Sequence, residues 1–203
     1  IRVGLASGVV FYALYLCTSS GLSFFKKILW VFLGVSLHYS VIVVAPFILF
    51  TELFFKRSVL MLILISTMPA LLIYISIDIL RSFIPIVEYY LTQEDFVNPY
   101  SSRNIVFIII LGLVFLNFRN IPAYSFPWIC MSFLGIGLFF GLISIPVFAH
   151  RFLELSIFPY LIWVPSLPKI PKIIALSLLF VFSTYFLYRA FFISPFFMSP
   201  LTT

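Results

Sequence analysis

Residues 128–167 read WICMSFLGIGLFFGLISIPVFAHRFLELSIFPYLIWVPSL, and this stretch decides the fold. A single helix of that length would run to about 60 Å, twice the hydrocarbon thickness of a bilayer, so the chain must turn back within it. Pro146, a helix-breaking residue, and Arg151, the first charged residue of the stretch, lie close together near its middle. We therefore predict two membrane-spanning helices joined by a tight turn between Pro146 and Arg151, with His150 and Arg151 at a membrane face.

Similar apolar runs recur along the whole chain. Of its 203 residues, 64% are hydrophobic and only 9% are charged, whereas soluble domains carry roughly 25% charged residues. A soluble fold of this composition would expose large apolar patches. We predict an all-α polytopic transmembrane helix bundle that forms one integral membrane domain over residues 1–203. Segments long and apolar enough to cross a bilayer lie at about 3–20, 28–50, 58–77, 104–118, 124–148, 152–167 and 173–193.

Seven spans divide the lysines and arginines equally between the two sides. One side receives Arg2, Lys56, Arg57, Arg119, Lys169 and Lys172, and the other receives Lys26, Lys27, Arg81, Arg103, Arg151 and Arg189. The positive-inside rule therefore gives a tie of six to six. We favour the first side as cytoplasmic because the long polar loop 78–103 lies on the second. The basic residues are scattered, which argues against a nucleic-acid partner.

The loop 78–103 is the one sizeable polar stretch, and tyrosines alternate in it with charged residues. Such a composition fits an interfacial segment with aromatic anchors. It also fits a carbohydrate site, where aromatic faces stack on sugars and carboxylates accept hydrogen bonds from hydroxyls. Glu94 and Asp95 are the candidate carboxylates, and Arg103 closes the loop.

His38 is the clearest polar residue at membrane depth, because it lies mid-way along the predicted span 28–50. It either joins two helices by a hydrogen bond or handles a proton near a substrate. Arg2 either binds phosphate or extends to the interface. Arg151 and Glu154 are spaced as an i, i+3 ion pair.

No metal site or cofactor is expected. The two histidines are more than 100 positions apart, and the sequence has no glycine-rich phosphate loop or nucleophile elbow. Cys17 and Cys130 lie inside apolar runs, which indicates small buried side chains rather than a disulfide or a metal ligand.

Three segments carry a resemblance to a known family. They are residues 1–6 (IRVGLA), residues 34–40 (GVSLHYS) followed by Pro46, and residues 151–155 (RFLEL) followed by Phe158 and Pro165. Together with the helix and basic turn between the first two, they resemble the EpsG family of bacterial membrane proteins, which are similar to Wzy-type polysaccharide polymerases. The chain begins at Ile1 without a methionine, and we expect further N-terminal helices before it.

The resemblance implies an enzyme of the bacterial cytoplasmic membrane. Such an enzyme would polymerise polyprenyl-pyrophosphate-linked oligosaccharide repeats for an exopolysaccharide, a capsule or an O-antigen, and it would require no cofactor. Flippase and chain-length-regulator proteins are the protein partners that the resemblance implies, besides the lipid bilayer.

The implied catalytic residues are His38 and Arg151, with Glu94 and Asp95 as further candidate bases. The implied substrate-binding residues are Arg2 and Arg151, and Tyr39 and Arg103 are further candidate substrate-binding residues beside them. Seven spans place Arg2 and Arg151 on opposite faces, which conflicts with a shared site.

Two other functions stay open at this stage. A transporter or flippase of lipid-linked sugars would also need polar residues inside the membrane. A non-enzymatic membrane subunit of a polysaccharide assembly complex would use His38 only to join helices.

Overall fold

The computed structural model describes residues 2–83, 98–188 and 191–192, and every regular element within these ranges is a helix except for a short π-type turn at 191–192. The main helices are α1 (Arg2–Ser19), α2 (Phe24–Leu37), α3 (Ala45–Leu49), α4 (Thr51–Phe54), α5 (Val59–Phe83), α7 (Ser102–Asn117), α8 (Phe126–Gly141), α9 (Pro146–Trp163) and α10 (Lys169–Tyr188). Short 3-10 turns lie at Tyr39–Val44, Phe118–Asn120, Ala123–Ser125 and Val164–Ser166. The predicted all-α bundle is confirmed.

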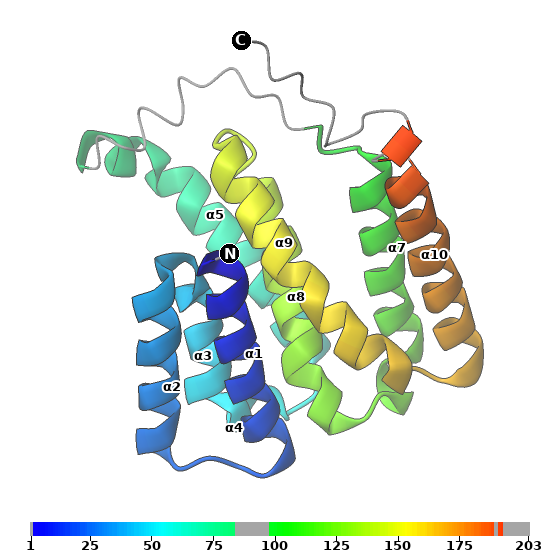
Figure 1. The fold of residues 1–203 in the computed structure, drawn as a ribbon, viewed down its shortest axis with the longest axis horizontal. Coiled ribbons are helices and arrows are strands. Elements are labelled where there is room, and N and C mark those ends of the chain that lie inside the picture. The colour runs from blue at the N-terminus through cyan, green and yellow to red at the C-terminus, as the bar shows by residue number, and fades with distance from the viewer. Residues whose placement is uncertain (1, 84–97, 189–190, 193–203) are drawn as a thin grey trace.

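Four of the described helical segments are long and apolar enough to cross a membrane: Ser102–Asn120, Ala123–Gly141, Pro146–Ser166 and Lys169–Tyr188. Helices α1 and α5 add two further apolar segments, Gly4–Ser19 and Val59–Ile73, within the part of the chain whose side chains the structure describes. The chain is therefore a multi-pass membrane protein. Helix α8 lies in the middle of the bundle, with 78% of its span buried, whereas α10 lies at the edge with 6% buried (Figure 1).

The turn in residues 128–167 comes slightly earlier than predicted. Helix α8 ends at Gly141, and α9 already begins at Pro146, which occupies its first turn. Proline is well tolerated there because the first N–H groups of a helix have no partner within it. His150 and Arg151 thus lie on the second turn of α9 rather than in the connection, still near the end of the helix.

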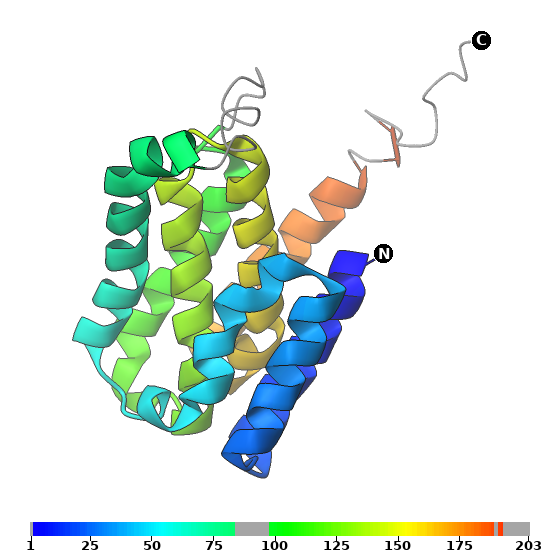
Figure 2. The same ribbon diagram turned by 90° about the vertical axis from the view of Figure 1, so that its left-hand side faces the viewer.

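The predicted span 28–50 is not one helix. Helix α2 ends at Leu37, His38 has an extended backbone (φ −162°, ψ 124°), and the chain then returns through the 3-10 turn Tyr39–Val44 and helices α3 and α4. Pro46 lies in the first turn of α3, where proline is tolerated, and the β-branched run 41–44 forms the 3-10 turn that precedes it. The segment folds back on itself as a hairpin whose tip is at His38 (Figure 2).

An ion pair fixes the base of this hairpin. Lys27, near the start of α2, contacts Glu52 of α4, 25 positions later in the chain. Both ends of the hairpin therefore lie at the same face of the bundle. The segment therefore does not cross the membrane as a single span. The assignment of charged residues to alternate sides, which assumed seven spans, does not apply.

The fold-back changes which charges share a face. Lys26, Lys27, Lys56, Arg57, Arg119, Lys169 and Lys172 lie at the ends of helices on one face, which we call the lysine face. The opposite face holds the first residues of α1, α7 and α9 and the last turn of α5, with Arg2, Arg81, Arg103 and Arg151; we call it the arginine face.

Candidate functional site

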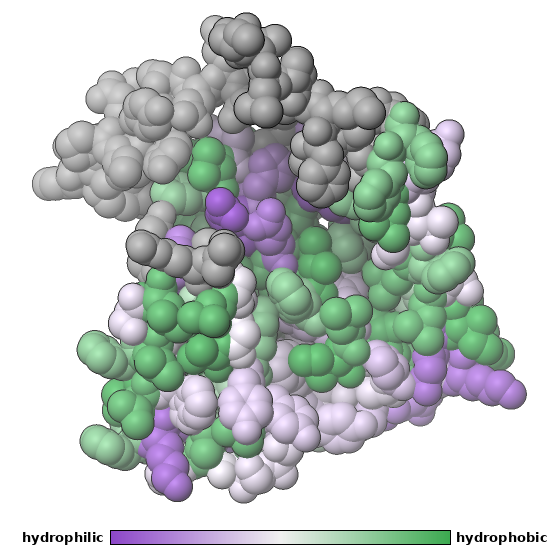
Figure 3. Space-filling model, in the orientation of Figure 1, coloured by the Kyte–Doolittle hydropathy of each residue, from purple (hydrophilic) through white to green (hydrophobic). Residues whose placement is uncertain are grey.

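The arginine face contains a polar pocket of about 450 Å³ between the first turns of α7 and α9 and the last turns of α10. Figure 3 shows hydrophilic side chains gathered in the upper middle of the molecule, on this side of the bundle. The pocket is lined by Asn98, Ser101, Ser102, Arg103, His150, Phe182, Tyr185 and Phe186. It therefore combines polar and basic groups with an aromatic wall.

The sequence before α7 builds a rigid start for that helix. The side chain of Asn98 accepts a hydrogen bond from the N–H of Tyr100 at 2.9 Å, and the hydroxyl of Ser101 accepts one from the N–H of Asn104 at 3.5 Å. Asn104, itself 1% exposed, donates to the carbonyls of Asn98 and Pro99 at 3.4 and 3.1 Å. This turn and cap hold Arg103 on the first turn of the helix.

Arg103 and His150 meet across the pocket. Nη2 of Arg103 lies 3.3 Å from Nδ1 of His150, although 47 positions separate the two residues in the sequence. Because a guanidinium has only donors, Arg103 donates and the ring nitrogen accepts. The contact brings a permanent cation next to a side chain that can take a proton.

Both helices that supply this pair begin at the pocket, so their N-terminal partial positive charges lie close to it. Arg151 adds a further cation on α9 and pairs with Glu154 at 3.3 Å, with both side chains about half exposed. An exposed pair of this kind is weak, which leaves Arg151 able to exchange its partner. The pocket is suited to an anion.

Opposite the cations, the pocket wall consists of Phe182, Tyr185 and Phe186 of α10. The ring of Phe182 also packs edge-on against Phe107, with centroids 6.0 Å apart. Flat aromatic surfaces beside hydrogen-bonding groups are typical of sites for sugars.

Helix α1 places Arg2 at the same face. The rings of Phe11 and Phe158 lie 5.4 Å apart, so α1 and α9 are neighbours. From that contact, Arg2 lies nine residues along α1 and Arg151 seven residues along α9 in the same direction, about 13 and 10 Å respectively. Both residues thus lie on the same side of that contact, which removes the conflict over opposite faces, and the N-terminal end of α1 lies deeper in the bundle than the first turn of α9 (Figures 1 and 2).

His38 lies at the hairpin tip on the other side of α1. Its N–H donates to the carbonyl of Gly34 at 3.1 Å, and its side chain is partly buried. Gly34 packs against Val10 of α1 so closely that a Cβ atom there would collide with it. His38 lies four residues after Gly34, so it is about 6 Å nearer to the arginine face than the contact between Gly34 and Val10. The hairpin that carries His38 packs beside α1, the helix that carries Arg2.

The other candidate residues are less fully placed. Tyr39 begins the 3-10 turn that follows His38, and Arg2 begins α1; the side chains of both lie outside what the structure describes. Glu94 and Asp95 lie outside the described residues. Of the sequence candidates, Arg103 lines the pocket, and Arg151 pairs with Glu154 on the adjoining turn of α9.

Two parts of this site were not predicted from the sequence. His150 was expected at a membrane face but was not a candidate for chemistry, although it directly precedes Arg151. The aromatic residues of α10 have no distinguishing signal, because Phe is abundant throughout the chain. Within the described residues, no group of three or more His, Cys, Asp or Glu side chains could hold a metal ion.

Comparison with known proteins identifies the family. The model of the EpsG family matches residues 1–203. No curated protein and no solved structure matches the chain. The chain belongs to the EpsG family, whose members are polysaccharide polymerase-like membrane proteins, and its role is in membrane polysaccharide biosynthesis.

Proposed function

We propose that this chain polymerises polyprenyl-pyrophosphate-linked oligosaccharide repeat units into a surface polysaccharide by glycosyl transfer. The observation that carries the proposal is the 3.3 Å contact between Arg103 and His150 in a pocket with an aromatic wall. The guanidinium fork suits pyrophosphate oxygens, the rings suit sugar faces, and a histidine can accept the proton of a sugar hydroxyl.

The reaction needs charge stabilisation and a base. A hydroxyl oxygen of the acceptor sugar attacks the anomeric carbon of the growing chain, and the bond from that carbon to the pyrophosphate oxygen breaks. The electron pair leaves with the polyprenyl pyrophosphate, and the hydroxyl proton passes to a base. Arg103, Arg151 and Arg2 would neutralise the departing pyrophosphate.

His150 is the base favoured by the contact. While Arg103 donates to Nδ1, that nitrogen cannot accept a proton. When pyrophosphate draws Arg103 away, Nδ1 becomes available to the acceptor hydroxyl. The base would thus become active only with the donor bound. His38 would orient the acceptor on the neighbouring side, with Tyr39 beside it, and Glu94 and Asp95 are the further candidate bases.

We propose that the arginine face is the outer face of a bacterial cytoplasmic membrane. The lysine face carries seven basic residues against four described on the arginine face, and the positive-inside rule places the more basic face in the cytoplasm. The pocket would then face the compartment in which lipid-linked repeats are joined. Flippase and chain-length-regulator proteins are its proposed protein partners.

Gel analysis of polysaccharide chain length tests the function. A strain that lacks the complete gene is rescued with wild type, Arg103→Ala, His150→Ala or Arg119→Ala, an exposed arginine of the lysine face that serves as the control. We expect a ladder of long chains with wild type and Arg119→Ala, and single repeats with the other two. Ladders of long chains in all four rescued strains would refute the site. Single repeats trapped on the cytoplasmic side of the membrane in the strain without the gene would favour transport over polymerisation.

A further inference from the structure

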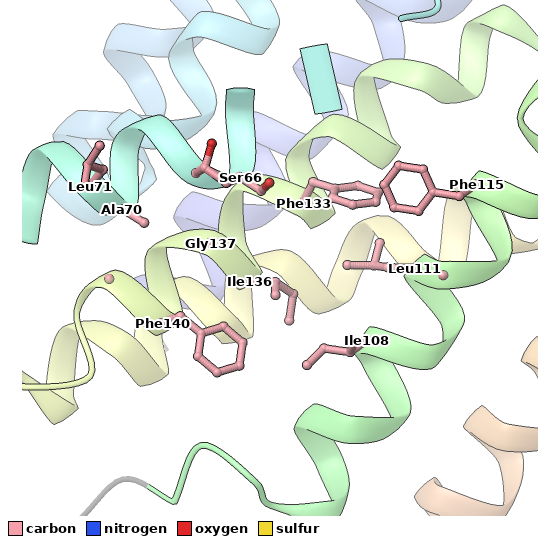
Figure 4. A pocket seen from close by; sticks show the side chains of 13 residues that line it. Ser66, Ala70, Leu71, Ile108, Leu111, Phe115, Phe133, Ile136, Gly137 and Phe140 are labelled. Atoms are coloured by element: carbon pink, nitrogen blue, oxygen red, sulfur yellow. The ribbon is translucent and has the colours of Figure 1, made fainter. Parts of the chain in front are cut away.

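A second cavity, of about 700 Å³, lies between α5 and α7 over α8. Figure 4 shows Leu71 of α5, Ile108 and Leu111 of α7, and Ile136 and Phe140 of α8 around it. Leu71, Ile108 and Phe140 are exposed. The cavity therefore opens to the outside of the bundle, where the hydrocarbon of the bilayer lies, and we call it the apolar groove.

The groove makes little demand for polar partners. Two hydroxyl side chains line it, those of Ser66 and Thr67. Both donate back to the carbonyl of Ile63 within α5, at 3.0 and 2.8 Å. The remaining lining is hydrocarbon, aromatic or glycine, so the groove suits a hydrocarbon chain.

Helix packing creates this space. A Cβ atom at Gly137 would collide with the backbone of Ser66. One at Gly141 would lie 2.6 Å from Cα of Ala70, so α5 packs directly on α8. On the facing wall, a Cβ atom at Gly112 of α7 would meet nothing within 4 Å. The bundle is thus closed between α5 and α8, and it is open between α5 and α7 along the groove.

An apolar strip leads from the groove to the lysine face. On α5, Ile63 and Leu60 precede the groove residue Thr67 by four and seven positions, which places both on the side of the helix that lines the groove. Both side chains are exposed. On α7, the groove residue Phe115 lies two positions before the helix ends at Asn117. The groove and the lysine face are therefore connected along the same side of both helices.

Basic residues stand at the lysine-face end of this strip. Lys56 and Arg57 directly precede α5, and both are exposed. Nη1 of Arg57 donates to the carbonyls of Arg119 and Ile121, at 3.1 and 2.9 Å. The Arg57 side chain therefore crosses from the start of α5 to the end of α7, the two helices that flank the groove. These bonds hold the guanidinium in place and leave its Nε and Nη2 donors for a ligand.

No acidic side chain within the described residues pairs with these two cations. The acidic side chains that the structure describes are Glu52, which pairs with Lys27, and Glu154, which pairs with Arg151 at the other face. The first N–H groups of α5, a helix of 25 residues, add partial positive charge at the same place. The lysine-face end of the strip therefore favours an anion.

The spacing between the cations and the groove matches a glycerophospholipid. Seven residues, about 10 Å, separate the start of α5 at Val59 from Ser66, the first groove residue on that helix. The headgroup and glycerol region on each side of a bilayer is roughly 5–8 Å thick. An acyl chain attached to a phosphate at Lys56 and Arg57 would therefore enter the apolar strip and continue into the groove.

We propose that the start of α5 and the apolar groove together bind an anionic glycerophospholipid, with its phosphate at Lys56 and Arg57 and one acyl chain in the groove. A zwitterionic lipid binds less well, because its headgroup brings a further cation to these two residues. The lipid fills the space that α5 and α7 leave open. The site lies at the face opposite the polar pocket and does not depend on the proposed function.

Photolabelling tests this site in the complete protein, reconstituted in phosphatidylcholine vesicles. The probe is phosphatidylglycerol with a diazirine on one acyl chain. We expect labelled residues on α5 and α7 at the groove, and labelling about fivefold weaker or less with a phosphatidylcholine that carries the same chain. Equal labelling by the two probes would overturn the proposal in favour of a general lipid groove.

The headgroup contact is tested with Lys56→Gln and a matched control, Lys169→Gln. Lys169 is also an exposed lysine of the lysine face, at the first residue of α10. Lys56→Gln should lower labelling by phosphatidylglycerol about fivefold, the effect of one basic group at an anionic headgroup, and Lys169→Gln should not. The hydrogen bond from Lys56 to Leu53 is made by the backbone, so the variant keeps it. Equal labelling of Lys56→Gln and wild type would overturn the proposal.

The chain contact is tested with Gly112→Phe, which fills the groove. Labelling should fall about tenfold, the loss of burying roughly two methylene groups. Gly8→Phe on α1, where a Cβ atom also meets nothing within 4 Å, should label like wild type. Normal labelling of Gly112→Phe would overturn the proposal.

A second copy of the chain is the competing occupant of the groove. Gly112→Cys places a thiol in the groove, whereas the native Cys17 and Cys130 are buried. Under the proposal, Gly112→Cys stays monomeric on oxidation in the same vesicles, as wild type does. Disulfide-linked dimers formed by Gly112→Cys and not by wild type would overturn the proposal in favour of contact between copies.

Discussion

On the lysine face, Lys27 pairs with Glu52 and joins two segments of one hairpin, whereas on the arginine face Arg103 reaches His150, a second potential cation. The first contact satisfies a charge within the fold. The second places a permanent cation beside a histidine whose ring nitrogen accepts its hydrogen bond, at a pocket, which favours an anion in that position. One face therefore uses its charges to hold helix ends together, and under the proposed function the other presents them to a ligand.

The largest expected effect is at the Arg103–His150 pair. Alanine at either position should reduce polymer per folded molecule about 100-fold, equivalent to about 2.7 kcal/mol, because both the pyrophosphate contact and the control of the base are lost. The double variant should be little worse than either single one, since groups that act as a unit are not additive. Polymer yields from purified, reconstituted protein measure this, and additive losses would argue against a joint role.

Arg57 should show the opposite behaviour on the lysine face. Its Nη1 donates to the carbonyls of Arg119 and Ile121 at 3.1 and 2.9 Å, which ties the start of α5 to the end of α7. Arg57→Ala should lower the free energy of unfolding by about 2 kcal/mol without changing polymer per folded molecule. Thermal unfolding followed by circular dichroism measures the first quantity, and an activity loss with unchanged stability would contradict it.

The flanking residues of the arginine face should have intermediate effects on activity. Alanine at Arg2, Arg151 or His38 should reduce polymer about tenfold, or about 1.4 kcal/mol, because each supports the donor or the acceptor from a neighbouring helix. His38→Asn separates the two roles of that residue: a hydrogen bond between helices would survive the change, and a proton-handling role would not. Normal ladders in all three alanine variants would confine the site to the Arg103–His150 pair.

The smallest expected effect is the pH dependence of the Lys27–Glu52 pair. The hydrogen bond from Lys27 holds the pKa of Glu52 below its ordinary value. The pair therefore stabilises the fold above that ordinary pKa, and its contribution is lost as the pH falls through the lowered pKa. Because the carboxylate is 70% exposed, the effect should be well below 1 kcal/mol and weaker in high salt.

Melting temperatures of wild type and Glu52→Gln between pH 7 and pH 3 test this prediction. The variant should melt lower at pH 7, and the two curves should converge on acidification. A constant difference between them at all pH values would show that the carboxylate charge is not what stabilises the hairpin.

The sequence predicted the helices well because apolar length is a strong signal in membrane proteins. It located the turn near Pro146 but missed that proline's place inside the first turn of α9. It did not predict the fold-back at His38, because hydropathy cannot distinguish a hairpin from a span of the same length. The β-branched run 41–44, which forms the 3-10 turn after His38, was the nearest available signal.

The candidate site was only partly predictable for a similar reason. Arg103 was proposed from the composition of its loop, and Arg151 from the resemblance. Their convergence with His150 depends on how α7, α9 and α10 pack, and nothing in the local sequence encodes a contact between positions 47 residues apart.

The most direct test of the contrast between the two faces is the amount of polymer per folded molecule in Arg103→Ala and Arg57→Ala, measured on the same preparations as their melting temperatures. We predict that Arg103→Ala melts like wild type and makes single repeats, whereas Arg57→Ala melts lower and makes normal ladders per folded molecule. Equal loss of polymer in the two variants, or a normal ladder with Arg103→Ala, would contradict the assignment of the arginine face as the working site.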